Sequence, residues 1–193
     1  MQNKVSPDIK MFDDVSTEMA FTSCMTRKSD QYLFENKPEQ INSIAQFLCR
    51  DLGKAGFYTE KQPHQVSLIE AINNAIFHRN LELSSKIKIL GDRNSFRDFL
   101  NIARQRMQEA PYWSRRVHIG FKLDHSQVFY LIRDEGSGFD SLILPDLKDP
   151  ETFQKPSGRG LMMIRSLCDE VCWDSTGSEI TLVKYREINA ETE

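Results

Sequence analysis

The chain has 193 residues, of which 39% are hydrophobic, 27% charged and 10% aromatic. This composition is typical of a soluble globular protein with a hydrophobic core, and it excludes fibrous and disordered chains. The formal net charge of −3 gives no reason to expect nucleic acid as a direct partner. Because no apolar run approaches the roughly 18 residues of a membrane helix and the first residues lack a signal-like segment, we expect no membrane partner and a cytoplasmic location.

The length favours one domain rather than two. We expect a flexible, polar arm at 1–15, a single folded domain at 16–187 and a frayed acidic tail at 188–193. A pair of strands is expected within 18–34, although the apolar alternation there is poor. Apolar residues at helical spacing then predict three helices, over 39–52, 64–79 and 95–109.

From Arg116 onward the apolar period changes from helical spacing to two. Segments 116–124 and 127–134 alternate or run apolar, and the polar residues between them can turn, so they predict a β-hairpin. A long loop marked by glycine and proline follows at 136–157, and loops of that length are usually functional or disordered. A last helix and two closing strands are expected over 161–167, 170–173 and 179–185.

Helices in one group and mostly antiparallel strands in series predict an α+β fold. The expected architecture is a two-layer α/β sandwich, with a mostly antiparallel sheet and the helices on one face. The helix at 64–79 would lie across that sheet.

Four cysteines are scattered along the chain, without a C-x-x-C pair or a matching pair of histidines. This spacing argues against a zinc site and favours buried thiols in a reducing compartment. They are Cys24, Cys49, Cys168 and Cys172.

The helix at 64–79 carries polar side chains that are poor candidates for a dry core. Glu70 and Asn74 are four residues apart and share a helical face, where a carboxylate can polarise a hydroxyl group and an amide oxygen can bind Mg²⁺. Taken singly, Asn74 is more often a capping or surface residue, and His78 is more often a structural residue that holds a backbone carbonyl. The buried stripe of the same helix is expected at Ile69, Ile72, Ala75 and Ile76.

Two glycine motifs follow. Asp134 ends a predicted buried strand and precedes Gly136 and Gly138, which allow a ligand ring to approach the backbone, although a tight turn also explains the glycines. Gly158 and Gly160 open directly into a helix, whose free N–H groups form an anion site that suits a phosphate chain. A single Gly-x-Gly is weak evidence, and its position after a long loop strengthens it.

In this order the three motifs resemble the N, G1 and G2 boxes of the GHKL ATPase superfamily. The chain is most similar, over about 31–186, to the anti-sigma-factor serine/threonine kinases, which are equally short and lack the phospho-acceptor helices of histidine kinases. The residues that carry the resemblance are Glu70, Asn74, Ala75 and His78, then Asp134, Gly136, Gly138 and Phe139, then Gly158, Gly160 and Leu161.

The resemblance implies a Bergerat-type ATP site between the helices and the sheet. By the family's pattern, Asn74 would hold the Mg²⁺ that bridges the phosphates, and Glu70 would act as a base or orient a hydroxyl group. Asp134 would bind the adenine amino group in a pocket shaped by Gly136 and Gly138. The phosphates would be covered by a mobile lid at about 144–159 and by the G2 residues Gly158, Arg159, Gly160 and Leu161.

The resemblance also implies an activity and partners. Members of this branch use Mg²⁺-ATP to phosphorylate a serine or threonine of a small STAS-type antagonist, and the same surface can sequester a sigma factor. From the family and from the apolar strand region near the N-terminus, we also expect a homodimer. The alternative is a non-catalytic module that binds nucleotide and sequesters a sigma factor or another regulator; a general ATPase of the chaperone or mismatch-repair kind is disfavoured, because it needs further domains.

The chain departs from a minimal member at 83–113, a longer link than expected after the N box. Between Arg79 and Arg116, nine Lys and Arg residues stand against four Asp and Glu residues, which suits either a solvated helical face or a docking face for an acidic partner. Arg79 also replaces the small glycine that often follows the motif histidine, which would shift the backbone's approach to the phosphates.

Overall fold

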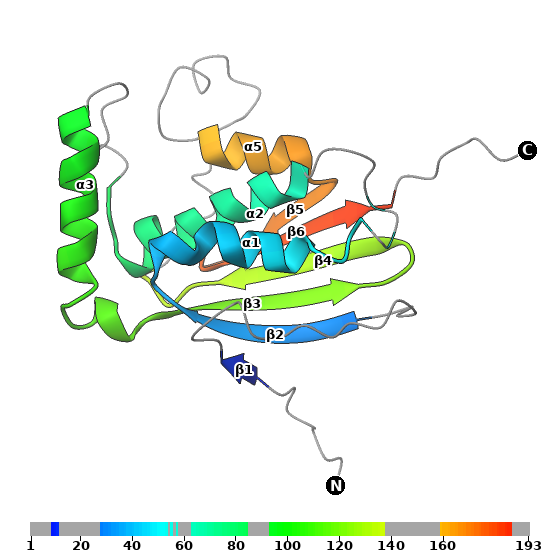
Figure 1. Ribbon diagram of the computed structural model, residues 1–193, viewed down its shortest axis with the longest axis horizontal. Helices are drawn as coiled ribbons and strands as arrows, with labels where there is room; N and C mark the ends of the chain where they lie inside the picture. Colours follow the sequence, from blue (N-terminus) through cyan, green and yellow to red (C-terminus); the bar gives the residue numbers. More distant parts are fainter. Residues whose placement is uncertain are drawn as a thin grey trace, which may run out of the picture.

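The computed structural model describes residues 9–11, 28–53, 55, 57, 63–84, 93–137 and 159–186. These residues contain one six-stranded sheet (Figure 1). Its strands are β1 (Ile9–Met11), β2 (Lys28–Glu35), β3 (Arg116–Leu123), β4 (Gln127–Arg133), β5 (Glu170–Trp173) and β6 (Glu179–Tyr185). The strand order is β1-β2-β3-β4-β6-β5, and each neighbouring pair is antiparallel except β1 with β2, which is parallel.

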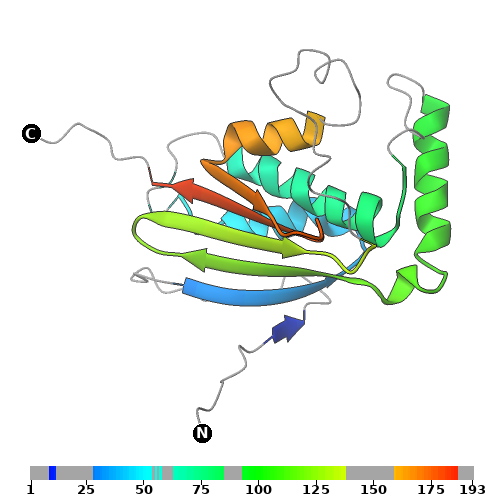
Figure 2. The same cartoon turned by 180° about the vertical axis from the view of Figure 1, so that it is seen from behind.

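Helices α1 (Ile41–Cys49), α2 (Pro63–Asn73) and α5 (Arg159–Leu167) lie on one face of this sheet (Figures 1 and 2). The expected α+β sandwich, with a mostly antiparallel sheet and helices on one face, is therefore confirmed. The remaining helical elements are the 3-10 turn η1 (Pro38–Gln40), the π-helix η2 (Asn74–Asn80), helix α3 (Arg93–Arg106) and the 3-10 turn η4 (Tyr112–Ser114).

Strands β3 and β4 form the predicted hairpin. Buried and half-buried side chains alternate along both strands, as period-two spacing requires when one face of a sheet is covered. At the turn, Asp124 Oδ1 accepts hydrogen bonds from the backbone N–H groups of Ser126 at 2.9 Å and Gln127 at 3.0 Å. This local bonding explains why a short polar turn was enough to predict the hairpin.

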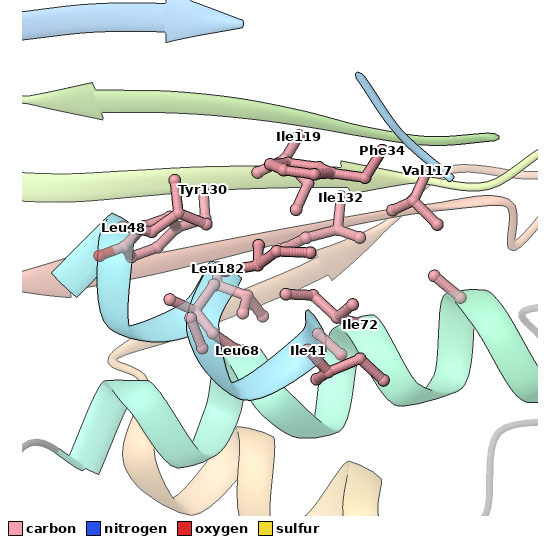
Figure 3. Packing of buried hydrophobic residues seen from close by; sticks show 14 of the residues in the cluster. Phe34, Ile41, Leu48, Leu68, Ile72, Val117, Ile119, Tyr130, Ile132 and Leu182 are labelled. Atoms are coloured by element: carbon pink, nitrogen blue, oxygen red, sulfur yellow. The ribbon is translucent and has the colours of Figure 1, made fainter. Parts of the chain in front are cut away.

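Side chains from α1 and α2 meet the sheet in one hydrophobic core (Figure 3). Leu48 of α1 and Leu68 and Ile72 of α2 are buried together with Ile132 and Leu182 of the sheet, each at most 3% exposed. Burying one such side chain contributes roughly 1.5–3 kcal/mol to folding. The core therefore fixes α2 on the sheet by its apolar side, and the polar side of α2 faces away from the sheet.

The predicted apolar stripe along this helix is largely confirmed. Ile72, Ala75 and Ile76 are buried, while Ile69 is half-buried and packs at the edge of the core. Asn74 is half-buried.

The helix predicted at 64–79 is not α-helical throughout. After Asn73 it continues as η2, in which the Leu81 N–H donates to the carbonyl of Ile76, five residues back, at 2.8 Å. A π-helical segment inserts one extra residue per hydrogen-bonded turn and occurs frequently at functional sites. Here it begins at Asn74, the residue expected to hold Mg²⁺.

Helix α3 belongs to the segment expected as an insertion at 83–113, and it stands beside the end of η2, crosswise to α1 and α2 (Figures 1 and 2). The ring of Phe99 packs against that of Phe77 with centroids 5.2 Å apart. Arg106 Nη1 donates to the carbonyls of Leu81 and Glu82, the latter at 2.7 Å. The inner side of α3 is thus fixed to the polypeptide that follows the N box.

The outer side of α3 is exposed. Arg97 and Arg104 donate hydrogen bonds to Asn94 and Asn101, each three residues earlier, at 3.3 Å and 3.1 Å. These contacts fit the interpretation of a solvated helical face. The alternative, a docking face for an acidic partner, stays a prediction.

The N-terminal expectation needs one correction. Ile9–Met11, placed in the flexible arm, form β1 and pair with residues 31–33 of β2. The arm is wrong at these three residues, because parallel backbone pairing holds them in the sheet. The rest of the arm, the first half of the strand pair expected within 18–34, and the tail at 188–193 lie outside the described residues.

Two further expectations are adjusted. Helix α5 begins at Arg159, two residues before the predicted start. Among the thiols, Cys49 is buried, Cys168 is half-buried and Cys172 is exposed, so burial was predicted wrongly for Cys172; Cys24 lies outside the part described. Within the same described ranges, no helix combines the length and apolar composition that crossing a membrane requires.

Candidate functional site

Helix α5 runs alongside α2 and brings the third motif onto the first (Figure 1). A Cβ atom at Gly160, in the first turn of α5, would lie 2.7 Å from Glu70 Oε2 and 3.9 Å from Asn74 Nδ2. Three residues predicted to act together are therefore neighbours in space. A side chain at position 160 would have to displace the Glu70 carboxylate, so glycine lets that carboxylate lie against the start of α5.

These neighbours have complementary chemistry. Glu70 provides a carboxylate, Asn74 provides an amide, and the nine-residue helix α5 begins beside them with backbone N–H groups that lack helical partners. A helix N-terminus attracts anionic groups such as phosphate, while amide and carboxylate oxygens suit Mg²⁺. The three features together fit a magnesium-bound phosphate chain.

A second group of residues lies where β4 ends. Asp134 is only 8% exposed, and its backbone N–H donates to the carbonyl of Ser178 at 3.0 Å. Its Oδ1 accepts a hydrogen bond from the Gly136 N–H at 3.0 Å. Burial raises the pKa of Asp134 to about 6, although the Gly136 N–H and the Arg79 guanidinium both favour the ionised form. Among the described residues, the hydrogen bond to this carboxylate goes to Oδ1, so the buried side chain suits an amino group of a ligand.

Residues 134–136, the G1 turn, pack against the C-terminal end of α2 and η2, which together form the N-box helix. A Cβ atom at Gly136 would lie 2.4 Å from the carbonyl oxygen of Arg79 and 3.0 Å from its Cα. Backbone atoms cannot move aside as a flexible side chain can, so only glycine fits at this position. The motif glycine thus has a packing reason in addition to the expected approach of a ligand.

Arg79 is the residue at which the sequence departs from the usual glycine. Its side chain is half-buried, and burial lowers the pKa of its guanidinium while the charge of Asp134 partly restores it. Arg79 therefore places a positive charge near Asp134, the carboxylate that is expected to bind the adenine amino group.

His78 has the structural role favoured by its position near a helix end. Its Nδ1 lies 2.7 Å from the carbonyl oxygen of Leu83, and because a carbonyl only accepts, Nδ1 carries the proton and donates. The histidine therefore secures the chain that leaves η2.

The remaining predicted site residues divide into two groups. Arg159 is exposed at the start of α5, and Leu161 is half-buried and packs against the core. Gly138, Gly158 and the lid up to residue 158 lie outside the described residues. Asn36, Asn80 and Ser178 were not predicted from the sequence, because their hydrogen-bond partners lie on distant segments. For Asn80, the polar residues at the end of the predicted helix could have indicated a role.

No group of three or more His, Cys, Asp and Glu side chains suited to a metal ion occurs among the residues that the structure describes. Mg²⁺ keeps several waters and is commonly held by one or two protein groups together with substrate phosphates. The Asn74 amide beside the start of α5 fits that kind of site, in which the nucleotide supplies most of the ligands.

Comparison with family models shows what this chain is similar to. The family model described as a histidine kinase-like ATPase domain matches residues 34–184. The match runs from the end of β2 into β6 and includes all three motifs. A search among curated proteins finds none that matches.

Proposed function

The chain belongs to the histidine kinase-like ATPase family of the GHKL superfamily, and on that premise we propose that it is a serine/threonine protein kinase that uses Mg²⁺-ATP. Family membership implies ATP binding. The finer proposal is a partner-switching role: phosphorylation of a STAS-type anti-anti-sigma antagonist and sequestration of a sigma factor by the same protein, acting as a homodimer in the cytoplasm.

One observation carries the proposal of catalysis. The Glu70 carboxylate lies against Gly160 at the N-terminus of α5 and beside Asn74. A module that only bound nucleotide would have no need of a carboxylate next to phosphate, because the like charges repel. A base that accepts a hydroxyl proton does need that position.

The described residues divide the binding of ATP between them. Asp134 would accept a hydrogen bond from the adenine amino group, and Asn74 would take part in holding Mg²⁺. The N–H groups at the start of α5 would face the phosphates. Mg²⁺-ATP supplies the transferable phosphoryl group and most of the charge neutralisation, so positioning is the main task of the protein.

In the transfer, the oxygen of a serine or threonine hydroxyl on the antagonist bonds to the γ-phosphorus as the bond to the β-phosphate oxygen breaks. Glu70 accepts the hydroxyl proton. The products are a phosphorylated antagonist and ADP, and no covalent enzyme intermediate is needed.

Replacement of Gly160 by alanine tests the contact with Glu70. The new Cβ would displace the carboxylate by a fraction of an ångström or more, so we expect transfer to slow by about 10- to 100-fold. Helical alanine is favoured over glycine by roughly 0.5–1 kcal/mol, so the fold should not be weakened. Transfer rates and thermal unfolding would be measured on the same protein.

Gly53→Ala is the matched control, because no atom lies within 4 Å of a Cβ at that exposed position. It should transfer phosphate at the wild-type rate. If Gly160→Ala also did so, Glu70 would not act where the proposal puts it.

The activity itself is tested by incubating the protein with γ-labelled ATP, Mg²⁺ and STAS-type proteins encoded in the same genome. The proposal expects label on a serine or threonine of one of them, and none when that residue is replaced by alanine. Tight ATP binding without transfer to any candidate would instead support the non-catalytic sequestering module.

A further inference from the structure

Asn80, the last residue of η2, is fully buried although its side chain is a carboxamide. Its Nδ2 donates to Asn36 Oδ1 at 2.8 Å and to the Arg116 carbonyl at 3.0 Å. Its Oδ1 accepts a hydrogen bond from the Glu135 backbone N–H at 2.8 Å. Buried polar groups are rarely left unsatisfied, so these three bonds fix the carboxamide in one orientation.

The bond to Glu135 lies inside the G1 turn. The N–H groups on either side of it are also used: that of Asp134 donates to the Ser178 carbonyl, and that of Gly136 donates to Asp134 Oδ1. Of these three consecutive N–H groups, the one of Glu135 connects the turn to the N-box helix. Asn80 therefore links Asp134 to the helix that carries the phosphate-binding residues.

A second contact joins the same two places. Gly136 packs so closely on the backbone of Arg79 that a Cβ there would lie 2.4 Å from its carbonyl oxygen. Residues 79 and 80 thus hold the G1 turn by a backbone contact and by a side-chain hydrogen bond. η2 runs from Asn74 to Asn80. It therefore carries the residue expected to hold Mg²⁺ at its start and the residue bonded to the G1 turn at its end.

We propose that Asn80 is a positioning residue of the nucleotide site, which fixes Asp134 relative to Asn74 so that one nucleotide can contact both. The inference rests on the proposed ATP site. Asn80 is fully buried and acts through the Glu135 N–H rather than by contact with the nucleotide.

The test compares ATP with ITP, which has a carbonyl oxygen at the purine position where ATP has its amino group. Wild-type protein should prefer ATP, because Asp134 accepts a hydrogen bond from that amino group. Asn80→Ala removes the anchor of Asp134, so ATP affinity should fall by about fivefold or more while ITP affinity changes little. Calorimetric titration with Mg²⁺ gives both affinities.

Asn36→Ala is the matched control. It removes another buried carboxamide from the same network, with its bonds to the carbonyls of Tyr112 and Arg115 and the one that it accepts from Asn80. The bonds of Asn80 to the Arg116 carbonyl and the Glu135 N–H stay in place. Asn36→Ala should cost comparable thermal stability and keep the wild-type ATP/ITP ratio. Hydrogen exchange of the Glu135 amide should quicken in Asn80→Ala and not in Asn36→Ala.

A folded Asn80→Ala protein with an unchanged ATP/ITP ratio would overturn the inference and leave the proposed function standing. If the wild-type protein bound neither nucleotide, the proposed function would fail first and the inference with it. Should Asn80→Ala not fold, Asn80→Ser, whose shorter hydroxyl cannot reach Glu135, is tested with the same two outcomes.

Discussion

Replacing Glu70 with glutamine is expected to slow phosphoryl transfer by about 10²- to 10⁴-fold, the range for loss of a general base. Glutamine keeps the shape of the side chain beside Gly160 but does not accept the hydroxyl proton at neutral pH. The dissociation constant for Mg²⁺-ATP should stay within a few fold. Single-turnover transfer and equilibrium binding, measured on one preparation, separate the two effects.

Asn73→Ala is the control for that variant. Asn73 is half-buried at the end of α2, next to the motif position, and has no assigned role in the chemistry. It should retain both binding and transfer. A Glu70→Gln protein that lost binding as severely as transfer would make Glu70 a binding residue rather than a base.

The second large effect is expected at Asp134. Asp134→Asn keeps an oxygen for the Gly136 N–H but removes the negative charge that would face the adenine amino group. A hydrogen bond to a charged group is worth about 1.5–3 kcal/mol, so ATP affinity should fall by about 10- to 100-fold. Protonation of Asp134 removes the same negative charge. The affinity of the wild-type protein for ATP should therefore decline as the pH falls below about 6, where Asp134 becomes protonated.

The same substitution should stabilise the protein at neutral pH. Burial raises the pKa of Asp134 from its ordinary 3.8 to about 6, so the folded state binds a proton more tightly than the unfolded chain. Stability therefore falls as the pH rises through this window, by an amount of the order of 1–3 kcal/mol. Asp134→Asn escapes this loss, and urea unfolding should show it more stable than wild type at pH 8 and nearly equal at pH 4.

Asp124→Asn gives a control of opposite sign. Hydrogen bonds from Ser126 lower the pKa of Asp124 from 3.8 to about 2, so its ionised form stabilises the folded state above pH 4 and that contribution is lost as the pH falls toward 2. The variant should be less stable than wild type at pH 8. If both variants were destabilised equally at pH 8, burial of the ionised Asp134 carboxylate would not destabilise the folded protein.

The sequence was sufficient where structure is determined locally. The β3–β4 hairpin follows from period-two alternation and an Asp124 turn whose bonds reach two and three residues along the chain. The buried stripe of the N-box helix follows from helical spacing. In both cases the signal and the contacts that realise it are close in sequence.

Long-range features could not be predicted in the same way. Asn80 has hydrogen-bond partners 36, 44 and 55 residues away in the sequence. The spacing of apolar residues along the chain does not predict contacts over such separations. Strand β1 is three residues long, too short for an alternation to show, and it exists through pairing with β2. The π-helical turn after Asn73 likewise depends on packing that helix propensity does not record.

The glycine motifs illustrate both situations. Gly136 was predicted to let a ligand ring approach the backbone, and Gly160 was predicted to open a helix whose N–H groups bind phosphate. The structure shows that the Arg79 backbone excludes a side chain at position 136, whereas a side chain at position 160 would have to displace the Glu70 carboxylate. The residue type was predictable, whereas the neighbours that enforce it became visible only in the fold.

The most direct test of a single nucleotide site is a calorimetric titration of the wild-type protein with ATP, with and without Mg²⁺, and with GTP for comparison. The account predicts saturable binding of one ATP per chain, tighter with Mg²⁺ and much weaker for GTP, which lacks the adenine amino group. Absence of ATP binding, or equal affinity for ATP and GTP, would contradict the assignment of Asn74 and Asp134 to one site.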